Sequence, residues 1–119
     1  MIRLTVLPPF AATLWLAACQ SGDHYYWGHY EDLLYVNYAQ PGKLSADDQI
    51  NTLRQDIQAA AAANKPIPPG VHAHLGNLYF QAGKVGMAQK EFETEKATYP
   101  ESATLMNWMI ERLSGKKQS

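Results

Sequence analysis

The sequence has little of what disulfide frameworks, cysteine-based metal sites and nucleic-acid-binding surfaces require. Its 119 residues contain one cysteine, Cys19, which excludes an intramolecular disulfide framework and a cysteine-based zinc site. Neither sign of charge is in excess, because ten Lys and Arg residues against eleven Asp and Glu residues give a formal net charge of −1. That balance excludes a strongly basic nucleic-acid-binding protein. The length suffices for one small domain.

Motifs of catalysis are missing as well. The sequence has no nucleophile elbow, phosphate-binding loop, HExxH zinc motif or Cys–His arrangement. His72 and His74 are two residues apart, so on a helix they point to different faces. His24 and His29 are five residues apart, an awkward spacing for two ligands of one metal ion. We therefore expect no enzyme, no metal or other non-covalent cofactor, no small-molecule substrate and no nucleic-acid partner.

The N-terminus has the layout of a secretory signal peptide, with a basic start, an apolar middle and small residues at its end. Arg3 precedes residues 4–18, which carry no charge and are too few for a membrane span of about 20 residues. The stretch ends Leu-Ala-Ala-Cys at 16–19, which resembles the bacterial lipobox. The resemblance implies cleavage between Ala18 and Cys19 and acylation of Cys19. The alternative is an ordinary signal peptide in which Cys19 happens to follow two alanines.

The predicted anchor also indicates a location. Residues 1–18 would be removed, Cys19 would carry the covalent lipid, palmitate included, and residues 19–24 would form a tether. Two or three acyl chains anchor a protein stably in a membrane. In enterobacterial lipoproteins an Asp after the acylated cysteine resembles an inner-membrane retention signal, and Gln20 stands there instead. We expect an outer-membrane protein whose domain faces the periplasm.

Residues 25–113 show apolar spacing of helical period and no convincing strand, which predicts an all-α domain before a polar tail at 114–119. A capping box at Ser45 marks one helix start. Breaks are expected at Pro41-Gly42, at the proline-rich connector 64–70, at Gly83 and at Pro100. The predicted helices span 25–38, 46–63, 71–82, 86–98 and 102–113.

The stretch from Pro69 to Ser102 resembles a tetratricopeptide repeat, a helix pair of about 34 residues. We expect Gly76 and Ala88 to let two antiparallel helices approach closely, with aromatic rings filling the space beside them. The residues that match the packing positions of that repeat are Leu75, Gly76, Tyr79, Ala88, Phe92 and Pro100.

The repeat pattern is also broken at two places. His72 replaces the usual Trp, and Glu95 replaces a small residue near the end of the second helix. A carboxylate at a packing position must be partnered or exposed. Since one repeat cannot bury its own apolar face, we expect a divergent helix pair in 25–64 to stack on it. Residues 102–113 would then form a capping helix after the two helix pairs.

The first predicted helix is unusually aromatic, with Tyr25, Tyr26, Trp27, Tyr30, Tyr35 and Tyr38. One helical face is indicated by the spacing of Trp27, Tyr30, Leu34 and Tyr38. So small a domain cannot bury every ring, and we expect Trp27 and Tyr30 to point inward. The candidate partner-binding residues are Tyr25, Tyr26, Tyr35 and Tyr38. The alternatives are a core helix with tyrosines at its edges and a surface that stacks on glycan such as peptidoglycan.

Five strings together resemble one family of small Gram-negative lipoproteins of unknown function. They are Tyr26-Trp27-Gly28, the hexapeptide 38–43, Pro68-Pro69-Gly70, Leu75-Gly76 and the tetrapeptide 99–102. In that family the gene typically lies beside genes for a lipoprotein similar to the curli-secretion channel protein CsgG and for another small lipoprotein. The resemblance implies an assembly at the outer membrane and assigns no site residue. We expect a protein-interaction or assembly subunit that binds CsgG-like and other small lipoproteins; the alternative is a peptidoglycan- or glycan-binding module.

Overall fold

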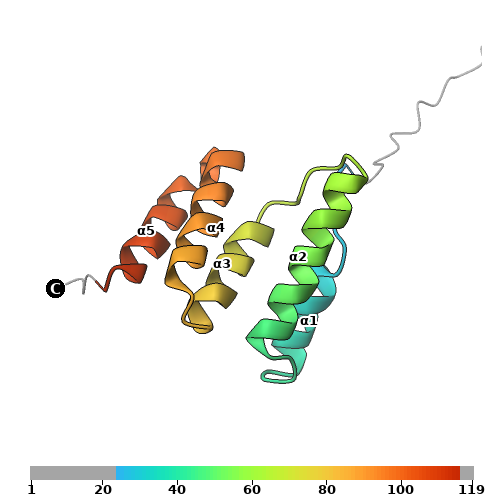
Figure 1. The fold of residues 1–119 in the computed structure, drawn as a ribbon, viewed down its shortest axis with the longest axis horizontal. Coiled ribbons are helices and arrows are strands. Elements are labelled where there is room, and N and C mark those ends of the chain that lie inside the picture. Colours follow the sequence, from blue (N-terminus) through green and yellow to red (C-terminus); the bar gives the residue numbers. More distant parts are fainter. Residues whose placement is uncertain (1–23, 116–119) are drawn as a thin grey trace, which may run out of the picture.

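The computed structural model describes residues 24–115, which form five α-helices, one short 3₁₀ helix and no strand (Figure 1). The all-α prediction is confirmed. The predicted signal peptide, Cys19 and most of the tether lie outside the described residues, as does 116–119 of the predicted tail. The helices are α1 Tyr30–Ala39, α2 Ala46–Ala62, α3 Val71–Gln81, α4 Val85–Thr98 and α5 Ala103–Leu113, with η1 Pro100–Ser102 before α5.

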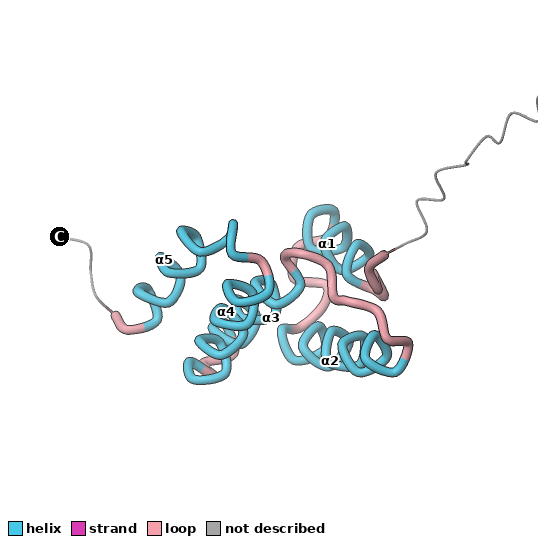
Figure 2. Tube along the Cα trace, turned by 90° about the horizontal axis from the view of Figure 1, so that it is seen from above, coloured by secondary structure: helices cyan, strands magenta, loops and turns pink. Residues whose placement is uncertain are grey.

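The helices form a row in which α1 and α2 occupy one end, α3 and α4 the middle, and α5 the other end (Figure 2). Helix α2 packs on α3, and α5 packs on α4. One apolar core runs through every helix, so no pair is left to bury its apolar side alone. Its buried members are Leu33, Ile50, Leu53, Val71, Leu75, Leu78, Tyr79, Ala88, Phe92 and Met106.

Helices α3 and α4 make the closest contact of the row. The ring of Phe92 lies against Gly76, because a Cβ atom added at Gly76 would come 2.6 Å from Phe92 Cε1. Phe92 and Ala88 are both fully buried. Of the other repeat-matching residues, Leu75 and Tyr79 are buried in the core. Pro100 is exposed and opens η1, which turns the chain from α4 into α5.

Helix α1 begins at Tyr30, so the prediction of a helix from Tyr25 was wrong for its first turn. Gly28 adopts φ +51°, a left-handed conformation that favours glycine. The N–H of His29 donates to the carboxylate of Asp56 in α2 at 2.8 Å. Tyr26 N–H donates to the Pro66 carbonyl at 2.9 Å. Acceptors far along the chain thus hold the segment before α1, and no local pattern reveals them.

The buried side of α1 also differs from the predicted one. Leu33 is buried and Tyr30 packs partly against the core, whereas Leu34 and Tyr38 are exposed. One turn beyond Leu33, the Asn37 amide donates to Gln49 Oε1 of α2 at 2.7 Å. The side of α1 that faces the core therefore carries residues 30, 33 and 37. Polar contacts to α2, rather than the spacing of apolar residues, determine which side of α1 faces inward.

Both helix pairs use one capping device. The N-cap residue of α1 is His29 and that of α3 is Gly70, and neither cap has a side-chain hydrogen bond of its own. Asp56 accepts from His29 N–H at 2.8 Å, and Glu95 Oε1 accepts from Gly70 N–H at 2.7 Å. Asp56 and Glu95 are each the eleventh residue of the second helix in their pair. A carboxylate at a helix N-terminus is favourable, so the two pairs share this cap, although α1 lies much less closely against α2 than α3 does against α4.

Candidate functional site

The first candidate surface is the exposed side of α1, formed by Leu34, Tyr35 and Tyr38 and called the α1 face below. These side chains are 42%, 68% and 87% exposed. Residues three and four apart are neighbours on a helix, so the three side chains form one apolar and aromatic surface. Contiguous exposed apolar surface marks interaction sites in soluble domains.

Helix α1 exposes this surface because it is apolar on two sides and has a neighbour on only one. Leu33 is buried against the core, whereas Leu34, the next residue, points to the surface. A helix that is apolar nearly all round is normally surrounded by protein. At the end of the row, within the part of the chain that the structure describes, nothing covers the side that carries Tyr35 and Tyr38. The α1 face is therefore an open helix surface with the composition of a packed one.

The structure does not bring Tyr25 and Tyr26 to the α1 face. The ring of Tyr25 packs edge-on against Trp27 and Tyr99, with centroid distances of 6.2 Å and 6.4 Å. Tyr26 is half-buried beside the connector that it meets through its N–H group. Both residues precede the start of α1, whereas Tyr38 is near its other end. The four predicted partner-binding tyrosines are thus divided between two places.

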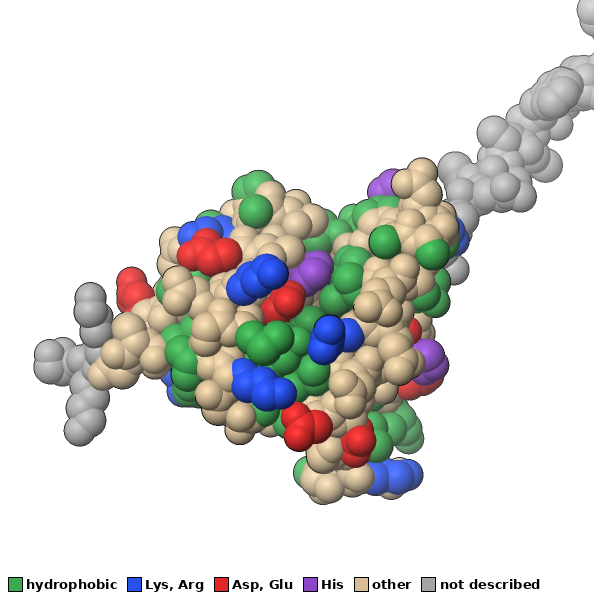
Figure 3. Space-filling model, in the orientation of Figure 1, with side chains coloured by type: hydrophobic (Ala, Val, Ile, Leu, Met, Phe, Trp, Pro, Cys, Tyr) green, Lys and Arg blue, Asp and Glu red, His purple; other side chains and the backbone are tan. Residues whose placement is uncertain are grey.

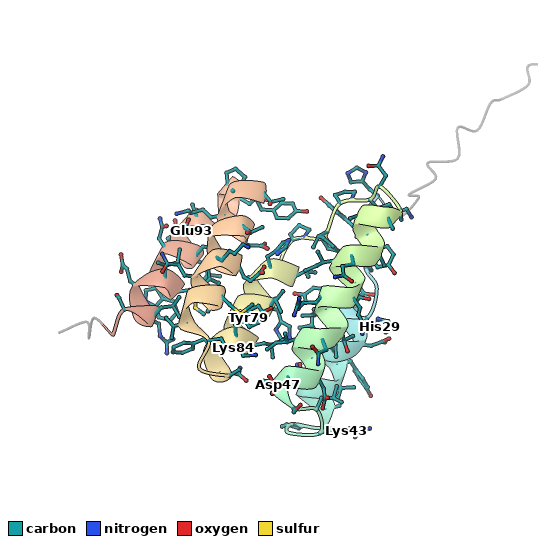
Figure 4. The ribbon with its side chains drawn as sticks, in the orientation of Figure 1. His29, Lys43, Asp47, Tyr79, Lys84 and Glu93 are labelled. Carbon is teal, nitrogen blue, oxygen red and sulfur yellow. The ribbon has the colours of Figure 1, made fainter. Side chains whose placement is uncertain are left out.

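The second candidate surface is a groove between α2 and the α3–α4 pair, with a volume of about 260 Å³, called the α2–α4 groove below. Apolar side chains occupy the middle of this face, and Lys and Arg side chains border them (Figure 3). Figure 4 shows Tyr79 between α2 and α4, with Lys84 and Asp47 near the lower end. The lining residues are Arg54, Ile57, Gln58, His72, Leu75, Tyr79, Met87, Lys90 and Glu91.

Charge is distributed unevenly in the α2–α4 groove. His72 Nδ1 and Glu91 Oε2 are 2.7 Å apart, so the acid of the lining is already engaged. Arg54 and Lys90 have no ion-pair partner among residues 24–115. The groove therefore offers two free cations at its rim. Sequence reasoning missed this site because its residues come from three helices and only His72 broke a recognisable pattern.

A cluster of buried polar groups joins α1, α3 and α4. Glu95 is 2% exposed; its Oε1 accepts from the Gly70 N–H, whereas its Oε2 is buried without a hydrogen-bond partner in the described residues. Burial raises the pKa of Tyr30, and the charge of Glu95 raises it further. The Tyr30 ring lies 6.0 Å from that of His74, whose pKa is lowered by burial. Tyr30 therefore lies between Glu95 and His74, and the buried Nε2 of His74 has no hydrogen-bond partner in the described residues.

Tyr99 fixes the edge of that cluster. Its hydroxyl donates to the carbonyl of Ile67 in the connector. Burial is the main cause that raises the pKa of Tyr99 to about 12, and the neighbouring Tyr25 and the carboxylates of Glu95 and Glu101 add to it. Tyr99 stays protonated at neutral pH and keeps this hydrogen bond. It therefore ties the end of α4 to the connector between α2 and α3.

No three His, Cys, Asp or Glu side chains come close enough to hold a metal ion in the described range 24–115. His29 and His72 each contact one carboxylate, that of Asp56 and that of Glu91.

Within residues 24–115, no helix has the length and hydropathy that crossing a bilayer requires.

Comparison with known proteins places the chain in a family. The family described as a domain of unknown function (DUF4810) matches residues 24–109, a stretch that holds α1 to α4 and the first seven residues of α5. Neither the curated proteins nor the solved structures contain a match to this chain.

Proposed function

The chain belongs to the DUF4810 family, whose function is unknown, and we propose that it is an outer-membrane lipoprotein acting as a protein-interaction or assembly subunit. Its partners would be lipoproteins in the periplasm, the CsgG-like one and other small ones. The observation that carries the proposal is the α1 face, where Leu34, Tyr35 and Tyr38 are exposed together. The lipobox at 16–19 supports the anchor.

A protein partner suits the chemistry of the α1 face. Tyrosine is enriched among the residues that dominate interface energetics, because its ring buries a large apolar area and its hydroxyl keeps a polar partner. The adjoining Leu34 adds an aliphatic surface that a protein helix can cover and a sugar ring uses less well. Truncating a central interface tyrosine typically costs about 2 kcal/mol or more of binding free energy.

We expect the double substitution Tyr35→Ala and Tyr38→Ala to reduce capture of the CsgG-like lipoprotein at least about tenfold. Both side chains are exposed, so the melting temperature should stay within about 2 °C of the wild type. The measurement is in-cell crosslinking of tagged full-length protein, followed by purification from outer membranes and quantitative mass spectrometry. Phe80→Ala is the matched control, because Phe80 is a 38% exposed aromatic residue of α3.

The same variants separate protein binding from glycan binding. Purified sacculi are incubated with the wild type and with the double variant, and bound protein is quantified. Lost lipoprotein capture together with unchanged sacculus binding supports the assembly subunit. Unchanged capture with lost sacculus binding overturns the proposal and replaces it with the glycan-binding module, in which exposed tyrosines stack on sugar rings.

The anchor is tested separately by Cys19→Ser. A serine hydroxyl is not a thiolate nucleophile, so the variant should lack the diacylglyceryl group and accumulate as a precursor that retains residues 1–18. Intact-mass measurement and labelled-palmitate incorporation report both effects. A Cys19→Ser protein that is cleaved after Ala18 and recovered in the outer membrane would refute the lipidation.

A further inference from the structure

We propose that the α2–α4 groove is a second binding site, which takes a short peptide segment in which one large apolar side chain lies between carboxylates. This site is separate from the α1 face and needs neither Tyr35 nor Tyr38. Three features carry the inference: the size of the groove, its apolar floor and the two free cations at its rim.

The size of the groove selects the kind of occupant. Its volume of about 260 Å³ is near the lower end of the range of about 300–1,000 Å³ in which ligand sites usually fall, so it suits one side chain better than a large ligand. The accessible floor consists of Met87, 45% exposed, and half-buried Ile57, above the buried side chains of Leu75 and Tyr79. Such a floor accommodates one leucine- or phenylalanine-sized side chain. Methionine adapts to differently shaped apolar partners.

The charges select what flanks that side chain. Arg54 comes from α2 and Lys90 from α4, so a cation stands on each side of the apolar floor. Glu91 contacts His72 at 2.7 Å and is half-buried, whereas Arg54 and Lys90 are exposed, so the two cations are the most accessible charges of the lining. An arginine guanidinium binds a carboxylate through two parallel hydrogen bonds. Acidic residues on both sides of one apolar residue complement this arrangement.

An exposed ion pair lies below the lined part of the groove. Lys84 Nζ, just before α4, lies 3.9 Å from Asp47 Oδ1 in the first turn of α2 (Figure 4). The chain's own C-terminus is a poor occupant, because Lys116 and Lys117 have the same charge as the rim.

The test measures binding of labelled peptides to the mature full-length lipoprotein in detergent by fluorescence anisotropy. The probe is Gly-Asp-Asp-Leu-Asp-Asp-Gly, and the matched peptides carry Asn for every Asp, or Ser for Leu. We expect saturable binding of the probe, binding at least about fivefold weaker for each matched peptide, and weaker binding as salt rises. Equal affinity for the all-Asn peptide, or no saturable binding of the probe, overturns the proposal.

Substitutions locate the binding. Arg54→Glu and Lys90→Glu should each reduce the affinity for the probe peptide about fivefold or more. Met87→Ser should also reduce this affinity, although it does not change the charge of the groove. Lys43→Glu is the matched control, since Lys43 is exposed in the turn between α1 and α2, away from the groove (Figure 4). If Lys43→Glu and Lys90→Glu reduce the affinity for the probe equally, the proposed site is wrong. It is also wrong if inorganic phosphate displaces the probe with the same affinity that the probe itself has. The Tyr35→Ala, Tyr38→Ala protein should bind the probe normally, so this site and the α1 face fail or hold independently.

Discussion

Replacing Gly76 by alanine is expected to destabilise the protein by about 2–3 kcal/mol, whereas the same exchange at Gly86 is expected to be neutral or to stabilise it by about 0.5–1 kcal/mol. Gly76 is the sixth of the eleven residues of α3, and Gly86 is the second residue of α4. Alanine is the better helix former, most clearly at the interior position of Gly76. The destabilisation expected at Gly76 therefore comes from packing.

The packing difference is large. A Cβ atom at Gly76 would lie 2.6 Å from Phe92 Cε1 and 2.7 Å from Phe92 Cδ1, whereas nothing lies within 4 Å of a Cβ atom at Gly86. Phe92 is fully buried, so its ring cannot move aside without displacing the neighbouring core. Overpacking costs about 1–3 kcal/mol, occasionally more, and contacts this short against a fully buried ring fall at the upper end of that range or above it. After the gain of about 0.5–1 kcal/mol in helix propensity, a loss of about 2–3 kcal/mol remains.

Thermal and urea unfolding of the two variants measure this difference. For a domain of this size, a loss of 2–3 kcal/mol corresponds to a fall in melting temperature of about 10 °C or more. A Gly76→Ala protein as stable as Gly86→Ala would show that α3 and α4 are farther apart than described. It would also remove the basis for the α2–α4 groove, which α3 and α4 line together with α2.

The second large effect is expected from Glu95→Ala, which should destabilise the protein by about 2–3 kcal/mol. The substitution supplies the small residue that the repeat pattern has at this position, so the pattern alone predicts a neutral or stabilising change. The structure predicts the reverse. Glu95 is the acceptor for the Gly70 N–H at the start of α3, and its loss leaves that donor without its partner and opens a void beside Tyr30.

Glu93→Ala is the matched control for Glu95→Ala. Glu93 lies on the same helix, has a half-exposed side chain and pairs with Lys96 at 2.9 Å in an i,i+3 contact. Such a surface pair contributes about 0.5 kcal/mol or less. Equal losses of unfolding free energy for the two variants in urea titrations would contradict the capping role assigned to Glu95.

Local signals were sufficient for most of the fold. Ser45 starts α2 as the sequence indicates, since its hydroxyl oxygen accepts from Asp48 N–H at 3.1 Å. Helix α3 begins at Val71 and α4 ends at Thr98, both at the predicted residues. These boundaries are set by capping residues, glycines and prolines within a few positions, and sequence patterns report such neighbours directly.

The start of α1 was not predictable in this way. The segment before α1 is held outside the helix by two acceptors that are distant in sequence. His29 N–H donates to Asp56, 27 residues farther along the chain, and Tyr26 N–H donates to the carbonyl of Pro66, 40 residues farther along. A periodicity argument assumes that each N–H finds its partner within the segment. The same limitation applies to Glu95, whose need for a partner was evident although the identity of Gly70 was not.

Of the two candidate surfaces, the α1 face could be expected from the sequence, whereas the α2–α4 groove could not. Exposure of Tyr35 and Tyr38 was expected, because six aromatic residues within 25–38 are more than so small a domain can bury. The α2–α4 groove depends on how α2 rests against α3 and α4, so Arg54, Met87 and Lys90 have nothing in common in the sequence. Groups that converge only through packing between helix pairs require the structure.

Site-specific photo-crosslinking from position 35 in living cells tests the central claim most directly. The full-length protein carries a photoreactive amino acid in place of Tyr35, and a second version carries it in place of Phe80 on α3. The account predicts that position 35 forms one dominant adduct with another outer-membrane lipoprotein and that position 80 does not. Muropeptide adducts at position 35, or the same adducts from both positions, would contradict it.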